Sequence, residues 1–352
     1  MNLFGKFIGI SKCQLNYLTH RTFTLPFLVL NITTNCNSRC QMCDFWKNPK
    51  PQELSLPEIK EIAGLTEKLN IKKFIVSGGE PLLHSDFSGV MEVLGKSKAK
   101  IGLATNGILL AEYASLVAKY CSTVFVSLDG SSSQVYRNVR GVDALASVMA
   151  GVKKLKTLNP LLLVIGRNII QKSNYLDLVA IIKTAREWGM DHISFSAADV
   201  KNAGFGRSGK VDSTTAQGIL LDEKDLIQFK QVITSFTKTY PKLFSTKFII
   251  EGYKNLINIH NYYSAMLGRS KFPPVYCNLP WLYAAVDADG KVRPCCLRQE
   301  IGNIRERSLG EIVTSAEMIE FRKQLKKQKD SKCSHCAYSS AKVHLKMLCE
   351  MF

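Results

Sequence analysis

The chain has no apolar run long enough to cross a bilayer as a helix, which takes about 20 residues. Its longest apolar stretch, residues 25–32, is short and is interrupted by Pro26 and Asn31. The sequence also has no recognisable secretory signal peptide, no internal repeat and no low-complexity tract. These absences argue against a membrane-spanning protein, a repeat protein and a disordered one, and they favour a cytoplasmic location.

Acidic residues are few compared with basic ones. The chain has 29 Asp and Glu against 47 Lys and Arg, a formal net charge of +18. Such a balance favours anionic partners such as nucleotide-linked substrates, phospholipid surfaces or RNA, although a generally basic surface explains it equally well. We do not expect nucleic acid. Residues 1–23 mix apolar and basic side chains, so peripheral membrane contact is open, but packing on the main domain is the stronger expectation.

The eleven cysteines are odd in number and clustered, which does not indicate a disulfide framework. Three of them, Cys36, Cys40 and Cys43, stand within eight residues directly after the apolar run of residues 27–33. A structural zinc site takes four protein ligands, so three thiolates from one loop leave a coordination position open. A four-iron four-sulfur cluster held by three cysteines keeps one iron free for a small chelating ligand. Reduced thiols, or half of a zinc site completed elsewhere, are the alternatives.

Short apolar runs alternate with helical patterns from about residue 27 to residue 198, which is typical of βα units and a parallel sheet. Six such units are too few for a closed eight-stranded barrel, so the sequence predicts an α/β fold, a partial (β/α)6 barrel of the TIM type. The expected strands are Phe27–Thr33, Lys73–Ser77, Ile101–Thr105, Thr123–Leu128, Leu161–Asn168 and His192–Ala197. The expected helices between them are Leu56–Lys68, Asp86–Ser97, Leu110–Tyr120, Ala144–Lys156 and Asn174–Trp188.

Beyond this region we expect a long loop at residues 199–222 and helices at 223–239 and 253–266. A hairpin with its turn at Asp289 and Gly290 and a helix at 309–328 then form a small module that carries cysteines. The chain is therefore divided into an N-terminal extension (1–24), a barrel (25–222), a connecting helical region (223–272) and a C-terminal domain (273–352).

Polar and glycine-rich motifs follow the ends of the expected strands. In parallel βα folds these ends lie at one edge, where active sites form. Ser77-Gly78-Gly79-Glu80 follows the second strand, and the glycines allow close approach of a ligand while Glu80 can accept from an ammonium group. Further groups end the next four strands: Thr105 and Asn106, Ser127 and Asp129, Arg167 and Asn168, and Ser196. Ordinary turn and cap chemistry is the alternative for each.

Taken together and in this order, the motifs resemble the radical S-adenosylmethionine (SAM) superfamily over about residues 25–200. The resemblance implies that Cys36, Cys40 and Cys43 hold a four-iron four-sulfur cluster whose fourth iron is chelated by the amino and carboxylate groups of SAM. It further implies contacts to SAM from Gly78, Gly79, Glu80, Ser127, Asp129 and Asn168. Met42 stands where the family often has an aromatic residue, and a flexible thioether can still pack against adenine.

The resemblance also implies the chemistry. The reduced cluster donates an electron to SAM, and the resulting 5′-deoxyadenosyl radical removes a hydrogen atom from the substrate. The substrate would be a small molecule or a peptide, which could be anionic. The electron would come from a reductant protein such as flavodoxin or ferredoxin. We identify no protein residue that donates or accepts a second hydrogen.

A second set of cysteines lies near the C-terminus: Cys277, Cys295, Cys296, Cys333 and Cys336. Neighbouring residues of an extended strand point to opposite faces, so Cys295 and Cys296 are not expected to share one centre. The set resembles the truncated SPASM module called twitch, and its Gly290 to Cys295 spacing selects Cys295. The resemblance implies an auxiliary four-iron four-sulfur cluster held by Cys277, Cys295, Cys333 and Cys336, for electron transfer or as a structural brace. A four-cysteine zinc site is the alternative.

A different class of function stays open at this point. Both cysteine sets could brace a non-catalytic zinc or iron–sulfur protein that binds RNA or a protein partner. Such a protein has no need of Gly78-Gly79-Glu80 and of Ser127 with Asp129 at successive strand ends, which favours the enzyme.

Overall fold

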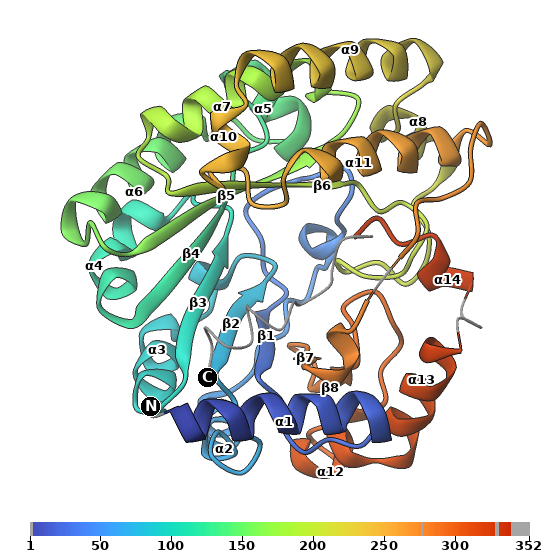
Figure 1. The fold of residues 1–352 in the computed structure, drawn as a ribbon. Helices are drawn as coiled ribbons and strands as arrows, with labels where there is room; N and C mark the ends of the chain where they lie inside the picture. The colour runs from blue at the N-terminus through green and yellow to red at the C-terminus, as the bar shows by residue number, and fades with distance from the viewer. Residues whose placement is uncertain (1–2, 276, 328–330, 339–352) are drawn as a thin grey trace.

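The structure is a computed structural model, and it describes residues 3–275, 277–327 and 331–338. Six parallel strands form its centre in the order β6-β5-β4-β3-β2-β1, each joined to the next through helical connections (Figure 1). This confirms the predicted α/β fold with a parallel sheet curved as a partial barrel. The strands are β1 (Phe27–Thr33), β2 (Lys73–Gly78), β3 (Lys100–Thr105), β4 (Cys121–Ser127), β5 (Leu163–Ile170) and β6 (His192–Ala197).

The helices pack their apolar faces on the outer side of these strands. The helix α2 begins with a capping box between Ser55 and Glu58, and α3 begins with Asp86 accepting from the backbone N–H of Gly89. Leu28 and Leu30 of β1 are fully buried, as alternation along a strand requires. The helices of this region are α2 (Leu56–Gly64), α3 (Phe87–Gly95), α4 (Leu110–Tyr120), α5 (Ser133–Arg140), α6 (Leu145–Leu158) and α7 (Leu178–Glu187), with three-residue turns η1 (Phe45–Lys47), η2 (Pro81–Leu83) and η3 (Tyr175–Asp177).

Three elements differ from the sequence prediction. A short helix, α8 (Ser213–Ile219), lies inside the stretch expected to be a loop. The single helix expected at residues 309–328 is two, α12 (Leu309–Thr314) and α13 (Ala316–Lys326), because Ser315 leaves helical geometry and caps the second helix. The helix α5 was not expected. The helices α9 (Glu223–Thr239) and α11 (Tyr253–Met266) match the prediction, and α10 (Lys242–Ser245) lies between them.

The C-terminal hairpin is part of the same sheet as the barrel strands. The strand β7 (Tyr283–Val286) pairs in parallel with β1. The strand β8 (Lys291–Arg293) pairs antiparallel with β7, and β9 (Gly302–Asn303) pairs antiparallel with β8. The turn between β7 and β8 is closed by the Gly290 N–H, which donates to the Asp287 carbonyl at 2.8 Å. The predicted hairpin is therefore present, and it continues the central sheet. The turn η4 (Leu279–Trp281) precedes it, and α14 (Ser331–Ser334) follows α13.

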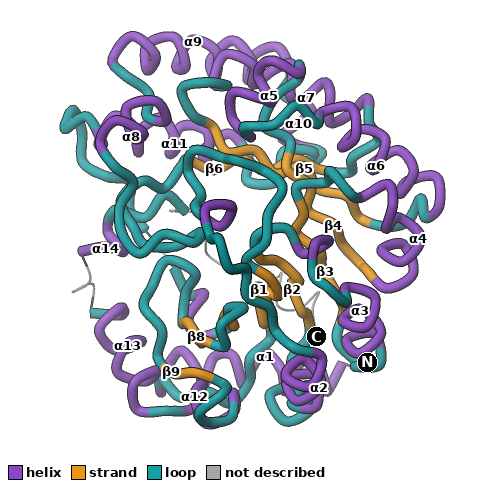
Figure 2. Tube along the Cα trace, turned by 180° about the vertical axis from the view of Figure 1, so that it is seen from behind, coloured by secondary structure: helices purple, strands orange, loops and turns teal. Residues whose placement is uncertain are grey.

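The helix α1 (Leu3–Thr19) packs on the body of the protein, as the stronger of the two expectations had it. Its Cys13 is buried with Trp281 and Leu282, near the residues where β1 and β7 begin. Figure 1 shows α1 close to α2 and α12, and Figure 2 shows the same end of the molecule from behind. None of the helices in the described ranges is long and apolar enough to span a membrane.

Candidate active site

The loop after β1 carries the first three cysteines into a buried position. Burial raises the pKa of the Cys36 thiol to about 11 and that of Cys43 to about 12, and it also raises the pKa of Cys40. A smaller part of the rise comes from the other thiols: Cys40 acts on Cys36, and both Cys40 and Cys36 act on Cys43. The predicted triplet is therefore brought together in a place where ionised thiols need a positive partner.

The donor chemistry of this loop fits an iron–sulfur cluster. Among the residues that the structure describes, no group of three or more His, Cys, Asp or Glu side chains is arranged to hold a single metal ion. Cys40 is buried, and Cys36 and Cys43 are partly buried. The backbone N–H of Ser38 donates to Cys36 Sγ at 3.5 Å, and the Arg140 guanidinium counteracts the rise in all three pKa values. Thiolates are the ligands of iron–sulfur clusters, and N–H donors to sulfur and nearby positive charge favour their anionic state.

The end of β2 lies directly against this loop. The Glu80 N–H donates to the Asn35 carbonyl at 2.7 Å, and the Gly79 N–H donates to the Thr33 carbonyl at 2.8 Å. A Cβ atom at Gly79 would collide with the Asn35 carbonyl oxygen, so glycine is needed for this close approach. The predicted Gly-Gly-Glu motif thus stands beside the cysteine triplet.

The Glu80 carboxylate is fully buried and accepts three hydrogen bonds. The donors are Thr105 Oγ1 at 2.7 Å, the Asn106 N–H at 2.6 Å and the Leu82 N–H at 3.2 Å. Burial nevertheless raises the pKa of Glu80 to about 6. A carboxylate has about four acceptor sites, so Glu80 keeps capacity for one further donor.

The end of β3 also holds the cysteine loop. Asn106 Nδ2 donates to Asn37 Oδ1 at 2.7 Å and to Ser38 Oγ at 3.1 Å. Both acceptors lie between Cys36 and Cys40 in the sequence, so Asn106 fixes the middle of the loop. The side-chain amide of Asn106 therefore donates its hydrogen bonds within the protein.

The predicted groups on β4 and β5 lie next to one another. Asp129 is 1% exposed, accepts from the Ile169 N–H at 2.7 Å and pairs with Arg140 Nη1 at 3.2 Å. Burial raises the pKa of Asp129 and the guanidinium lowers it. Ser127 Oγ donates to the Thr105 carbonyl at 3.4 Å. Asn168 is buried, donates to the Leu128 carbonyl at 2.9 Å and leaves its Oδ1 without a protein partner. Their roles toward SAM stay predictions.

Arg140 is a site residue that the sequence reading missed. It ends α5, whose first turn is capped by Ser132 and whose end is marked by Gly141 in left-handed geometry. The Arg140 carbonyl accepts from the Arg39 N–H at 2.8 Å, and its buried Nε has no hydrogen-bond partner among the residues that the structure describes. The serine and the glycine are a helix signal that could have placed Arg140 near the strand ends.

Arg207 is a second site residue that the sequence did not indicate, and it contacts the cysteine loop at Met42. It lies on residues 199–207, which we name the bridging loop. Its buried guanidinium donates to the carbonyls of Met42, Asp199 and Asn202, the last two at 2.9 and 3.2 Å. Met42 is itself buried at 7% exposure beside Cys40. No local pattern could have identified Arg207, because the carbonyl it binds lies far away in the sequence.

The bridging loop contacts both cysteine sets. On one side the Phe205 carbonyl accepts from the Asp44 N–H at 2.8 Å and from Cys43 Sγ at 3.4 Å. On the other side Gly204 lies against residue Cys296, since a Cβ there would stand 2.9 Å from the Cys296 carbonyl oxygen. This one segment therefore joins the two places where clusters are predicted.

The four predicted ligands of the second set also influence one another. Burial raises the pKa of Cys277 and Cys336 to about 12; Cys295 and Cys333 add to the rise for Cys277, and Cys295 adds to it for Cys336. Arg298 Nη2 donates to Cys333 Sγ at 2.7 Å. The four thiols thus lie near one another, and their role as ligands stays a prediction. Cys349 lies outside the described residues.

The argument that separated Cys295 from Cys296 is wrong. It assumed an extended strand, but β8 ends at Arg293 and both cysteines lie in the turn that follows. Their thiols share a hydrogen bond, which lowers the pKa of Cys295 and raises that of Cys296. The choice of Cys295 as the ligand is a prediction that depends on the spacing from Gly290 alone.

Comparisons with known proteins agree with this geometry. Residues 30–185 match the family described as the radical SAM superfamily, and residues 277–337 match the family described as an iron–sulfur cluster-binding domain, SPASM. Among curated proteins, a GTP 3′,8-cyclase of Peptoclostridium acidaminophilum is 32% identical over 38% of this chain and 43% of its own length. A probable GTP 3′,8-cyclase of Sulfurisphaera tokodaii is 28% identical over 78% of this chain and 82% of its own. The chain thus spans less than half of the first of these relatives.

Solved structures show the same fold. SuiB of Streptococcus suis, bound to its precursor peptide SuiA, aligns over 96% of this chain and 76% of its own, with a TM-score of 0.62 and 15% identity. The protein anSMEcpe with bound S-adenosylmethionine aligns over 93% of this chain and 94% of its own, with a TM-score of 0.63 and 18% identity. At these identities the likeness concerns the fold.

Proposed function

We propose that this chain, which belongs to the radical SAM superfamily and carries a SPASM domain, is an enzyme that cleaves SAM reductively and uses the product radical on a substrate. The observation that carries the proposal is the convergence of separate segments on the Cys36–Cys43 loop. The ends of β3 and α5 and the bridging loop contact it directly, and the end of β2 contacts Asn35 just before it. A brace for a single loop does not need a buried carboxylate with spare acceptor capacity beside it.

When bound, a four-iron four-sulfur cluster with SAM on its free iron would supply the electron that breaks a carbon–sulfur bond and gives a 5′-deoxyadenosyl radical. The chain's own part is to bind and to position. Cys36, Cys40 and Cys43 would be the thiolate ligands, and Glu80 would accept from the SAM ammonium group at its remaining acceptor site. Asn168 Oδ1, buried and without a protein partner, suits a ribose hydroxyl.

Asp129 has a narrower role in this proposal. Its carboxylate already binds Arg140 and the Ile169 N–H, so it would hold the Arg140 guanidinium beside the thiols. A positive charge there offsets the negative charge of a thiolate-bound cluster. Ser127, whose Oγ has only a 3.4 Å bond to a carbonyl, is free to turn toward a ribose.

We infer that the substrate carries an anionic group. Arg167 is exposed although it belongs to β5, an inner strand of the sheet, and its neighbours in register are Ser127 and Ser194. It acts electrostatically on Asp129 and on Glu251. An open guanidinium between two serines suits a phosphate or carboxylate. The curated relatives are named for GTP, and SuiB binds a precursor peptide; both kinds of molecule can carry such a group.

The second cysteine set would hold an auxiliary cluster for electron transfer. The bridging loop supports this role, because it contacts the cysteine loop at Cys43 and the second set at Cys296. Only this short segment would separate the two clusters. The external electron would come from a reductant protein of the flavodoxin or ferredoxin type.

The test compares two variants that each lack one buried thiol, one in the candidate site and one outside it. In Cys40→Ala, anaerobically reconstituted protein should lose the iron and sulfide of one cluster and form no 5′-deoxyadenosine from SAM under reduction. The matched control is Cys121→Ala, which removes another buried thiol at the start of β4, and it should keep both. Unchanged 5′-deoxyadenosine formation in Cys40→Ala, or zinc without sulfide in the unaltered protein, would refute the proposal.

A further inference from the structure

The outward face of α1 carries a row of apolar side chains. Ile8 is 40% exposed, Leu15 is 42% exposed and Leu18 is 67% exposed. Their spacing of seven and three residues places them on one side of a helix. Phe23, 43% exposed, follows just after the helix ends. Single exposed apolar residues are common on proteins, but a row of them along one helix marks a contact surface.

The helix is held firmly, so this row is presented in a fixed orientation. Asn16, on the opposite side of α1, is fully buried and donates to the Thr24 carbonyl at 2.7 Å and to the Trp281 carbonyl at 2.6 Å. Its Oδ1 accepts from the Phe23 N–H at 2.7 Å. Cys13 packs beside Trp281. The inner face of α1 is thus fixed to the body of the protein, while Ile8, Leu15 and Leu18 stay exposed.

Basic side chains lie near the C-terminal end of α1, beside Tyr17. The first acidic residue of the chain is Asp44, so α1 has none. Lys326 of α13 places its Nζ 4.8 Å from the centre of the Tyr17 ring. The pKa of His20, at the end of α1, is lowered first by burial and then by Lys326, Lys323 and Arg322, which reports a positive field at this face.

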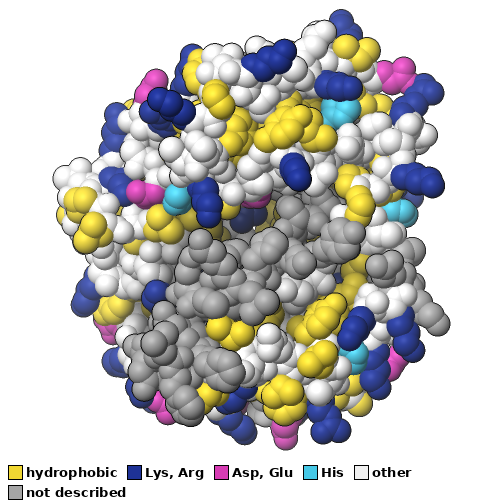
Figure 3. Space-filling view, viewed as in Figure 1, with side chains coloured by type: hydrophobic (Ala, Val, Ile, Leu, Met, Phe, Trp, Pro, Cys, Tyr) yellow, Lys and Arg dark blue, Asp and Glu magenta, His cyan; other side chains and the backbone are white. Residues whose placement is uncertain are grey.

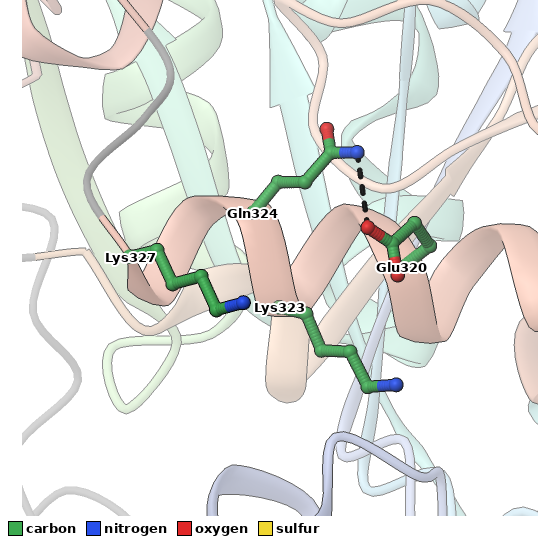
Figure 4. Close-up of a pocket in the computed structure, with 4 residues that line it drawn as sticks. All are labelled: Glu320, Lys323, Gln324 and Lys327. Atoms are coloured by element: carbon green, nitrogen blue, oxygen red, sulfur yellow. Dashed lines mark hydrogen bonds between the residues drawn. The ribbon is translucent and has the colours of Figure 1, made fainter.

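The figures show how these groups are distributed. In Figure 3 hydrophobic and basic side chains are interspersed at the lower right of the molecule, where Figure 1 places α12, α13 and the C-terminal end of α1. Figure 4 shows Lys323 on α13 and Lys327 just after the end of that helix; with Glu320 and Gln324 they line a pocket there. The surface therefore combines apolar side chains that can enter an interface with cations that can meet anions beside it.

This combination fits an anionic lipid surface better than other occupants. A second copy of the chain would bring two positively charged faces together, which is unfavourable. A nucleic acid would meet the cations but gain little from exposed leucine and isoleucine. Interfacial helices of peripheral proteins show this arrangement, with apolar residues that enter the headgroup boundary and Lys or Arg that face anionic lipids.

We propose that the outer face of α1, together with the basic edge of α13, binds this protein peripherally to a bilayer surface rich in anionic phospholipid. The α1 end of the sheet is where β1 and β7 begin, and the cysteine loop follows the other end of β1. Seven strand residues span about 20 Å. Binding through α1 therefore leaves the candidate active site on the side away from the bilayer.

The first experiment measures vesicle binding of the full chain at physiological salt. Vesicles of phosphatidylcholine with one-third phosphatidylglycerol should carry the protein in flotation, vesicles of phosphatidylcholine alone should not, and high salt should release it. Equal binding to both kinds of vesicle, or binding to neither, overturns the proposal.

The second experiment uses matched variants. Leu18→Glu should reduce binding to the anionic vesicles by at least about tenfold, because it removes an apolar contact and adds a repelled charge. Ile227→Glu, on α9 at 63% exposure, is the control and should bind as the unaltered chain does. Likewise Lys323→Glu with Lys327→Glu should weaken binding, whereas Lys153→Glu with Lys154→Glu, on α6, should weaken it much less.

Two outcomes would decide against the proposal even if the vesicle signal exists. If Ile227→Glu and Leu18→Glu lose binding equally, the attraction is only that of net charge. If Leu18→Glu converts a dimer to a monomer in sedimentation and vesicle binding is unchanged, the face joins two copies of the chain. Circular dichroism melting of each variant confirms that a loss of binding is not a loss of folding.

Discussion

Two buried carboxyl groups of the candidate site differ in how their charge is balanced. Asp129 has a guanidinium 3.2 Å away, whereas Glu80 accepts only from neutral donors. Hydrogen bonds from the Thr105 hydroxyl and two backbone N–H groups do not fully replace the water that Glu80 has lost, so its pKa is raised to about 6. A cationic ligand next to Glu80 would restore the balance.

We expect this difference to appear in the pH dependence of SAM binding. A proton on Glu80 removes the charge that would meet the SAM ammonium group, so affinity should fall as the pH drops below about 6. Equilibrium binding of SAM to the reconstituted protein from pH 5 to pH 8 measures this. The variant Glu80→Gln should bind at least about tenfold more weakly at pH 7.5, and its affinity should no longer fall below about pH 6. A variant that keeps that fall would show that another group is responsible.

The same carboxyl group should affect stability with the opposite sign. Its pKa in the folded chain lies above the ordinary value of 4.5, so the folded state binds the proton more strongly between pH 4.5 and about 6. This contribution stabilises the cluster-free protein as the pH falls through that window, by about 2 kcal/mol at most.

At the level of single residues, a site can be predicted from the sequence where its motif is local. Cys36, Cys40, Cys43, Gly79 and Glu80 could be singled out because they stand close together in the chain, and the structure places them near one another. The cap of α5 could have placed Arg140 near the strand ends, but its pairing with Asp129 could not be predicted, and Arg207 could not be assigned at all, because the partners of both are brought close only by the fold. Neither the choice between Cys295 and Cys296 nor the geometry of their turn could be read from adjacency alone.

At the level of elements, the bridging loop is the least regular part of the site and the most constrained. Gly206 has a φ of +80°, and a Cβ there would stand 2.6 Å from the backbone nitrogen of Phe45. Residues 45–47 form η1, which follows the cysteine loop immediately. Any side chain at position 206 must therefore displace either the bridging loop or the segment next to Cys43.

We expect Gly206→Ala to disturb the first cluster without unfolding the barrel. A left-handed alanine costs about 1–2 kcal/mol, and the contact with Phe45 adds to it. Iron and sulfide content after reconstitution should fall, and the spectroscopic response to added SAM should weaken. The matched control is Gly209→Ala, three residues further along, where an added Cβ meets nothing within 4 Å. Equal cluster loading in both variants would show that the loop does not support the triplet.

Prediction of elements was best where the apolar period was unbroken and the ends were capped. The strands of the barrel and the helices α4, α9 and α11 agree with the sequence pattern because their burial follows it. The region 199–222 was predicted to be loop because it is rich in Gly, Ser and Thr, and α8 forms there from an Asp212 cap that composition alone does not reveal. Ser315 breaks the predicted helix at 309–328 because its side chain caps the next one.

On the scale of the whole molecule, the central sheet does not stop at the boundary between the two family matches. Four residues of β7 pair with the first four of β1, so the strand that leads to the cysteine triplet is flanked on one side by β2 and on the other by the C-terminal region. The helix α1 contacts the same junction through Trp281. The domain boundary predicted at residue 273 separates the two sets of cysteines, but backbone hydrogen bonds between β1 and β7 cross it.

We therefore expect the barrel and the C-terminal hairpin to unfold together. In cluster-free protein with Trp46→Phe and Trp188→Phe, the remaining tryptophan, Trp281, reports on the junction, and far-ultraviolet circular dichroism reports mainly on the barrel. The two urea transitions should have the same midpoint. A fluorescence change that clearly precedes the loss of secondary structure would show that the hairpin separates first.

The bridging loop has a consequence for how the protein matures. The three cysteines leave the ribosome early, but the backbone around Cys43 is held by Phe205 and Arg207, which are synthesised much later. The triplet therefore reaches its final shape only when most of the barrel exists. Delivery of iron and sulfide to this loop is expected to be a post-translational step, carried out on a nearly finished chain.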